Sequence, residues 1–168
     1  MARIPLAKAA RAVLLLCFAN AAEAQRYGDA VRTELNALDV EATCEVPEGG
    51  NRLRCSWQAA DGDGTRSLEV RLILDDARHT LYLSALVGTA QPSAEPTNAL
   101  LRRLGEYNWS ALSTKLEWHP VSGAVRLSAL QHTDSNFDRR AFRALVRLMN
   151  RESIRVASML ERTRSTSP

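Results

Sequence analysis

The chain has 168 residues, of which 45% are hydrophobic and 24% are charged, and its formal net charge is +3. This length and balance predict one ordinary globular domain with a sizeable apolar core. Beyond the first 24 residues the chain holds 19 basic and 18 acidic side chains, so its charge is nearly balanced. A nucleic-acid-binding domain normally has a clear basic excess, and we therefore expect no nucleic-acid partner.

The first 24 residues are organised like a cleavable bacterial signal peptide. Basic residues open the chain, and a short apolar run follows at 13–19. Ala22 and Ala24 are small residues at the two positions that signal peptidase reads, which predicts cleavage between Ala24 and Gln25. The apolar run is shorter than the about 20 residues that span a bilayer, and the other interpretation is an amphipathic N-terminal helix. We expect a periplasmic or secreted protein that has no transmembrane segment after the signal is removed.

Cys44 and Cys55 lie on either side of the Gly-Gly pair at 49–50. Folding the flanking segments into an antiparallel hairpin about these glycines places Cys44 opposite Cys55 and Glu45 opposite Arg54. Residues opposite one another in a hairpin have Cα atoms about 4.5–5.5 Å apart, a distance that a disulfide can bridge. Because an exported protein meets oxidising conditions, we expect a structural disulfide; the alternative is two reduced thiols in the core.

The spacing of apolar residues predicts three helices, at 26–38, 97–112 and 139–162. Alternating apolar residues predict six strands in three hairpins, at 41–47 with 52–59, 68–74 with 81–85, and 116–118 with 125–127. Strands joined by short turns are antiparallel. The resulting order α-β-β-β-β-α-β-β-α predicts a single α+β domain over 25–162, followed by a frayed tail at 163–168.

Three stretches carry a resemblance to a known family: Asn98-Ala-Leu-Leu-Arg-Arg-Leu-Gly-Glu-Tyr-Asn108, Thr114-Lys-Leu-Glu-Trp118 and Gly123-Ala-Val-Arg-Leu127. Together with the element order over about 26–160, they resemble the YbjN family of bacterial sensory-transduction regulators, whose fold is similar to that of class I type III secretion chaperones. The export signal and the paired cysteines depart from that family. The resemblance implies a non-enzymatic protein-binding module, often a homodimer, that presents sheet or helix surfaces to its partner.

No catalytic constellation or metal-binding motif is visible in the sequence. The histidines at 79, 119 and 132 share no ligand spacing with each other or with the cysteines. Asp61-Gly-Asp-Gly64 begins like a calcium loop, but Leu72 stands where the bidentate glutamate is needed. We therefore expect neither an enzyme nor a bound cofactor or metal ion.

The predicted last helix has an arginine at every fourth position: Arg139, Arg143, Arg147, Arg151 and Arg155. One interpretation is a solvated face whose long arginine stems cover apolar surface. The functional interpretation is a dock for an acidic protein partner or an anionic membrane surface, with Arg143, Arg147 and Arg151 as the candidate contacts.

The three tryptophans are predicted to lie in or beside the core, and ligand stacking is the alternative role for Trp109. The leading hypothesis is thus a periplasmic binding module that acts through its sheet edges or its last helix. The alternative is a carrier of a small apolar ligand or lipid, held in a pocket between the sheet and the helices.

Overall fold

A computed structural model describes residues 27–47, 52–90, 98–133 and 136–165, with side chains as far as Arg162. The predicted signal peptide and the Gly-Gly turn lie outside these residues. The described part has the predicted element order, with a short 3-10 turn at Asp76–Arg78, and is mixed α+β. Its elements are α2 (Gly28–Asn36), β1 (Thr43–Glu45), β2 (Arg52–Ala60), β3 (Ser67–Asp75), β4 (Thr80–Thr89), α3 (Asn98–Ser110), β5 (Lys115–Trp118), β6 (Ala124–His132) and α4 (Arg139–Ser165).

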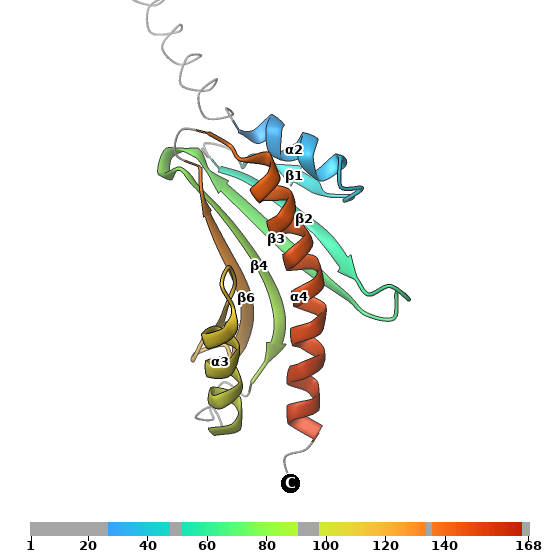
Figure 1. The fold of residues 1–168 in the computed structure, drawn as a ribbon, viewed down its shortest axis with the longest axis vertical. Helices are drawn as coiled ribbons and strands as arrows, with labels where there is room; N and C mark the ends of the chain where they lie inside the picture. Colours follow the sequence, from blue (N-terminus) through green and yellow to red (C-terminus); the bar gives the residue numbers. More distant parts are fainter. Residues whose placement is uncertain (1–26, 48–51, 91–97, 134–135, 166–168) are drawn as a thin grey trace, which may run out of the picture.

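The six strands form one antiparallel sheet in the order β1-β2-β3-β4-β6-β5 (Figure 1). The register places Cys44 opposite Cys55 and Glu45 opposite Arg54, and both predicted pairs are confirmed. In the last hairpin the predicted pairing of 116–118 with 125–127 is confirmed as well. Strand β1 is shorter than predicted because Pro47, which has no N–H to donate to a sheet, closes the segment.

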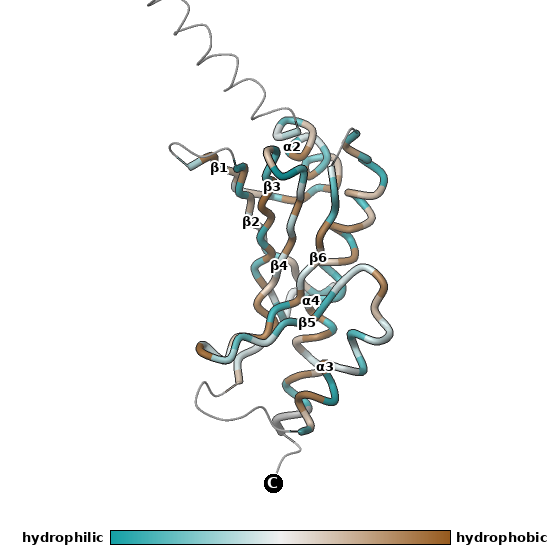
Figure 2. Tube along the Cα trace, turned by 90° about the vertical axis from the view of Figure 1, so that its left-hand side faces the viewer, coloured by the Kyte–Doolittle hydropathy of each residue, from teal (hydrophilic) through white to brown (hydrophobic). Residues whose placement is uncertain are grey.

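The three helices of the described residues cover the same face of the sheet, so that the sheet and these helices form two layers (Figure 2). Helix α4 runs along the sheet, α2 lies across its N-terminal end, and α3 lies beside its C-terminal half (Figure 1). The predicted apolar face of α4 is buried against the strands; it consists of Phe142, Leu145, Val146, Met149, Val156 and Leu160. No helix in the described residues is long and apolar enough to cross a membrane.

Polar contacts cap the first turn of α4 and attach its middle to the sheet. The Asp138 side chain accepts hydrogen bonds from the backbone N–H groups of Arg140 and Ala141, both at 2.9 Å, and so caps the first turn. The buried indole of Trp57 on β2 donates to the Asn150 side chain at 2.8 Å. The bond between Trp57 and Asn150 gives the helix a directional contact with the sheet, in addition to the non-directional packing of its apolar side chains.

The opposite face of the sheet is not covered by any element in the described ranges. Successive residues on a strand point to opposite faces, so this open face carries the side chains that alternate with the core positions. One cross-strand row consists of Arg54, Ile73, Tyr82 and Leu130, which are neighbours in the register. The open face therefore mixes charged, hydroxyl and single apolar side chains, as an ordinary solvated sheet face does.

The predicted disulfide between Cys44 and Cys55 is present, and the two Cα atoms are 4.1 Å apart. It joins β1, an edge strand of only three residues, to β2. So short a strand makes few ladder hydrogen bonds, and the covalent bond therefore supplies much of its attachment to the sheet.

Replacing both Cys44 and Cys55 by serine is expected to lower the free energy of unfolding by about 2–3 kcal/mol, the loop-closure value for an 11-residue separation. Denaturant unfolding of the oxidised protein and of the double variant measures this difference. A reductant should destabilise the wild-type chain by a similar amount and leave the double variant unchanged. Equal midpoints for oxidised wild type and variant would contradict a stabilising role for the bond.

Candidate protein-binding surfaces

The first part of the α4 arginine row pairs with a buried carboxylate on α2. Glu34 is almost fully buried, and its carboxylate lies 3.5 Å from Arg139 Nη1 and 3.1 Å from Arg143 Nε. The second contact has the distance of an ion pair but not the direction of a hydrogen bond, since Glu34 Oε2 accepts none in the described part of the chain. A buried carboxylate is costly without a cationic partner, so these two arginines connect α2 to α4.

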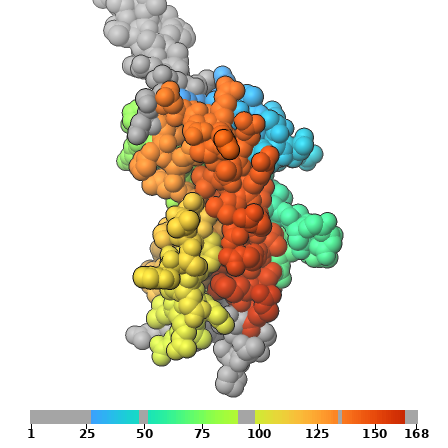
Figure 3. Space-filling view, in the orientation of Figure 1, coloured from blue at the N-terminus to red at the C-terminus, as the bar shows by residue number. Residues whose placement is uncertain are grey.

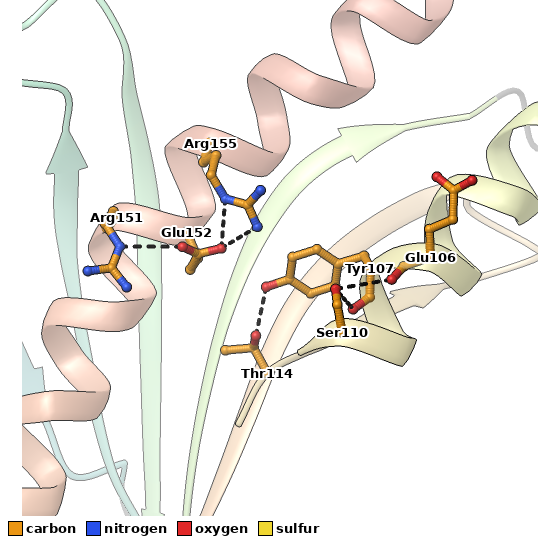
Figure 4. A network of polar contacts seen from close by, with 7 residues as sticks. All are labelled: Glu106, Tyr107, Ser110, Thr114, Arg151, Glu152 and Arg155. Carbon is orange, nitrogen blue, oxygen red and sulfur yellow. Dashed lines mark hydrogen bonds and ion pairs between the residues drawn. The ribbon is translucent and has the colours of Figure 1, made fainter. Parts of the chain in front are cut away.

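The last part of the row pairs with Glu152 on the same helix, which directly follows Arg151 and lies about one turn before Arg155 (Figure 4). Arg151 Nε lies 3.4 Å from Glu152 Oε1, and Arg155 donates twice to Oε2, at 2.9 and 2.6 Å. The hydrogen bonds from Arg155 to this carboxylate raise the pKa of its guanidinium. The Arg155 guanidinium also lies 5.6 Å from the centre of the Tyr107 ring, within cation–π range, and this contact joins α4 to α3.

Tyr107 holds α3 in place from inside the molecule. Its ring is buried, and its hydroxyl is 2.7 Å from the hydroxyl of the buried Thr114, just before β5 (Figure 4). Burial raises the pKa of the Tyr107 phenol above its ordinary value, so the neutral form persists and the hydroxyl pair keeps its hydrogen bond. The helix is therefore anchored to β5 on one side and to α4 on the other.

Asn108 occupies the free backbone edge of β5. Its side-chain N–H donates to the carbonyl of Leu116 at 3.1 Å, and its oxygen accepts from the N–H of Leu116 at 2.7 Å. This reciprocal pair imitates a neighbouring strand at the exposed end of the sheet. An added strand would have to displace it, so β5 is a poor site for β-sheet extension, and β1 at the other edge has three residues only.

The structure thus separates the three arginines that the sequence suggested as contacts. Arg143 and Arg151 have carboxylate partners within the chain. Arg147 is exposed and makes no ion pair or side-chain hydrogen bond with any residue that the structure describes. The regular spacing therefore does not produce one continuous row of free cations.

Trp109 is the most unusual surface residue: 93% of it is exposed to solvent. Trp57 is buried as predicted and Trp118 is partly buried, but the core position predicted for Trp109 is wrong. Trp109 follows Tyr107 by two residues, which is about 200° around the helix, so only one of the two can face the core. The core takes Tyr107, and the indole of Trp109 points away from it.

Two more exposed apolar residues lie on α3 or directly after it. Leu101 is two helical turns earlier and is 47% exposed, and Leu112, just after the helix, is 99% exposed. We call these three residues the Trp109 surface. Helix α3 lies beside α4 on the face of the molecule that Figure 3 shows. Grouped apolar residues of this size usually mark an interaction site, whereas exposed leucines that stand alone are common.

The described residues contain no group of three or more histidine, cysteine, aspartate or glutamate side chains placed to hold a metal ion. No protein-family model and no curated protein matches this chain. The chemistry of its surfaces therefore provides the evidence for its function.

Arg143 and Arg147 provide a matched test of which arginines are structural. Arg143→Ala is expected to lower the free energy of unfolding by about 1–3 kcal/mol, because it removes the nearer cationic partner of buried Glu34. Arg147→Ala is expected to stay within about 0.5 kcal/mol of wild type. Denaturant unfolding of both variants provides the comparison, and equal stabilities would show that the pairing with Glu34 contributes nothing.

Proposed function

We propose that this protein is an exported, non-enzymatic module that binds another protein through the Trp109 surface. The observation that carries the proposal is the exposure of Trp109, at 93%, next to Leu112, at 99%. Tryptophan is the residue type most enriched among the energetic hot spots of protein interfaces. Burying a tryptophan and two leucines removes a large apolar area from water, at about 25 cal/mol for each Å².

The surface is held rigidly, which favours binding. The helix that carries it is anchored by the hydroxyl pair of Tyr107 and Thr114, by the amide pair between Asn108 and Leu116, and by the contact of Arg155 with the Tyr107 ring. A partner that docks on Trp109 therefore does not have to order the helix first. Preorganisation of this kind lowers the entropic cost of association.

Charged side chains border the apolar residues, as they do at the rim of most protein interfaces. Arg102, Arg103 and Glu106 are exposed on α3 beside the Trp109 surface. This border favours a protein partner over an apolar small molecule, because it offers directional contacts of both signs.

Two further features support the proposal. The disulfide between Cys44 and Cys55 fits an oxidising compartment such as the periplasm. The space between α4 and the sheet, where the alternative of an apolar-ligand carrier requires a pocket, is occupied by fully buried side chains, which include Leu72, Leu83, Leu127, Phe142 and Met149. We therefore favour the binding module over the carrier.

Site-specific photo-cross-linking tests the proposal in cells that produce and export the full chain. A photoreactive phenylalanine analogue in place of Leu112 is expected to cross-link to protein, and the additional substitution Trp109→Ala should reduce the cross-linked product about tenfold or more. Mass spectrometry of the product identifies the partner.

The same analogue in place of Leu130 is the matched control, since that leucine is also exposed but lies on the open sheet face. Equal products from the two positions, or a product at 112 that survives Trp109→Ala, would refute the Trp109 surface as the binding site. A lipid or metabolite that co-purifies in stoichiometric amount would favour the carrier instead.

A further inference from the structure

We infer that the Trp109 surface binds a second copy of this chain, with the two α3 helices packed antiparallel about Gly105. This inference rests on the proposed function, because it names the occupant of the same surface. It is carried by three observations on α3: the order of large and small residues, the position of an unexplained glycine, and the placement of two opposite charges.

Leu101, Gly105 and Trp109 follow one another at four-residue intervals, so each is about 40° around α3 from the one before, and they form one slowly winding stripe in the order large, small, large. Gly105 is exposed, and a Cβ atom added to it would meet nothing within 4 Å. Packing within the chain therefore does not require this glycine, although glycine inside an exposed helix is less stable than alanine. A small residue between two large ones is suited to the close approach of another helix at this point.

A twofold axis through Gly105 makes this stripe complementary to itself. When two α3 helices cross antiparallel there, Leu101 of one copy lies opposite Trp109 of the other, and the reverse contact forms at the same time. The two indoles then pack against leucines on either side of the crossing. Leu112 lies opposite the start of α3 in the second copy, which extends the apolar contact beyond the helix.

The charges beside the stripe fit the same arrangement. Arg102 and Glu106 are exposed on the flank of α3 next to Trp109. Antiparallel packing about Gly105 brings Arg102 of each copy next to Glu106 of the other, and two intermolecular ion pairs result. Parallel packing would place the two charged flanks on opposite sides of the contact, where these pairs cannot form, so charge favours the antiparallel arrangement.

These side chains are available for such pairs. Arg102 makes no ion pair or side-chain hydrogen bond within the part of the chain that the structure describes, and Glu106 pairs only with Arg103 on its own helix, at 3.0 Å. The sheet edge beside α3 is a poor route to self-association, since the Asn108 side chain already bonds the backbone N–H and carbonyl of Leu116. We therefore expect self-association at this end of the molecule to use contact between helices.

Sedimentation velocity of the full chain, recovered after export from a producing bacterial host, measures the association. We expect a dimer. Trp109→Ala and Gly105→Leu should each raise the dissociation constant of the dimer about 100-fold or more, because each change acts twice in a twofold interface. Val121→Ala, at an exposed position away from α3, is the control and should leave the dimer intact. Circular dichroism and unfolding midpoints verify that each variant is folded.

Charge reversal tests the antiparallel arrangement itself. Arg102→Glu and Glu106→Arg should each weaken the dimer about tenfold, and the two together should restore it, because the pairs re-form with exchanged signs. A chain that stays monomeric, or a dimer that tolerates both Trp109→Ala and Gly105→Leu, would overturn the inference. If the monomer instead cross-links from position 112 to a different protein, the second copy is excluded while the proposed function stands. Binding of the monomer to anionic lipid vesicles through Trp109 would overturn both.

Discussion

The structure depends above all on the packing of the apolar face of α4 against the sheet. This helix contacts β2, β3, β4 and β6, and it also contacts both other helices. The described elements cover one face of the sheet only, so most of the core lies between these strands and α4. Removing Phe142 or Met149, both fully buried, would take away contacts that several strands share. The positions of α2 and α3 follow from α4, because each is attached to it through charged side chains at the border of this apolar face.

This arrangement determines which arginine side chains of α4 have partners on the neighbouring helices. Arginines that flank a buried stripe lie where neighbouring helices arrive, so Arg143 meets Glu34 from α2 and Arg155 meets the Tyr107 ring from α3. Their long stems cover the edges of the core while their charged ends hold the helices together. Among the described helices α3 contacts α4, and the side of α3 that carries Trp109 is exposed to solvent. The proposed binding surface therefore lies on this exposed flank of α3.

Local patterns predicted the elements well because their causes are local. Alternation about a Gly-Gly pair determined the partner of Cys44, and the spacing of apolar residues identified the buried face of α4. Contacts between distant segments were not predictable in the same way. The pairing of Glu34 with Arg143 requires two helices to meet, and the sequence pattern of neither helix indicates that it packs against the other. Trp109 was misplaced for a related reason: periodicity identifies residues that share a face, but the neighbouring elements decide which face is covered.

Trp109 is exposed on the isolated chain, and we expect it to be covered when the protein binds, while the core residue Trp57 stays buried in both states. Hydroxyl-radical footprinting, read by mass spectrometry, measures the exposure of both residues in one experiment. In dilute solution Trp109 should be oxidised far faster than Trp57, and its oxidation should fall when association is driven by concentration or by a captured partner. Leu130 on the open sheet face should react equally in both states. Oxidation of Trp109 as slow as that of Trp57 in the dilute chain, or no protection on association, would contradict the account.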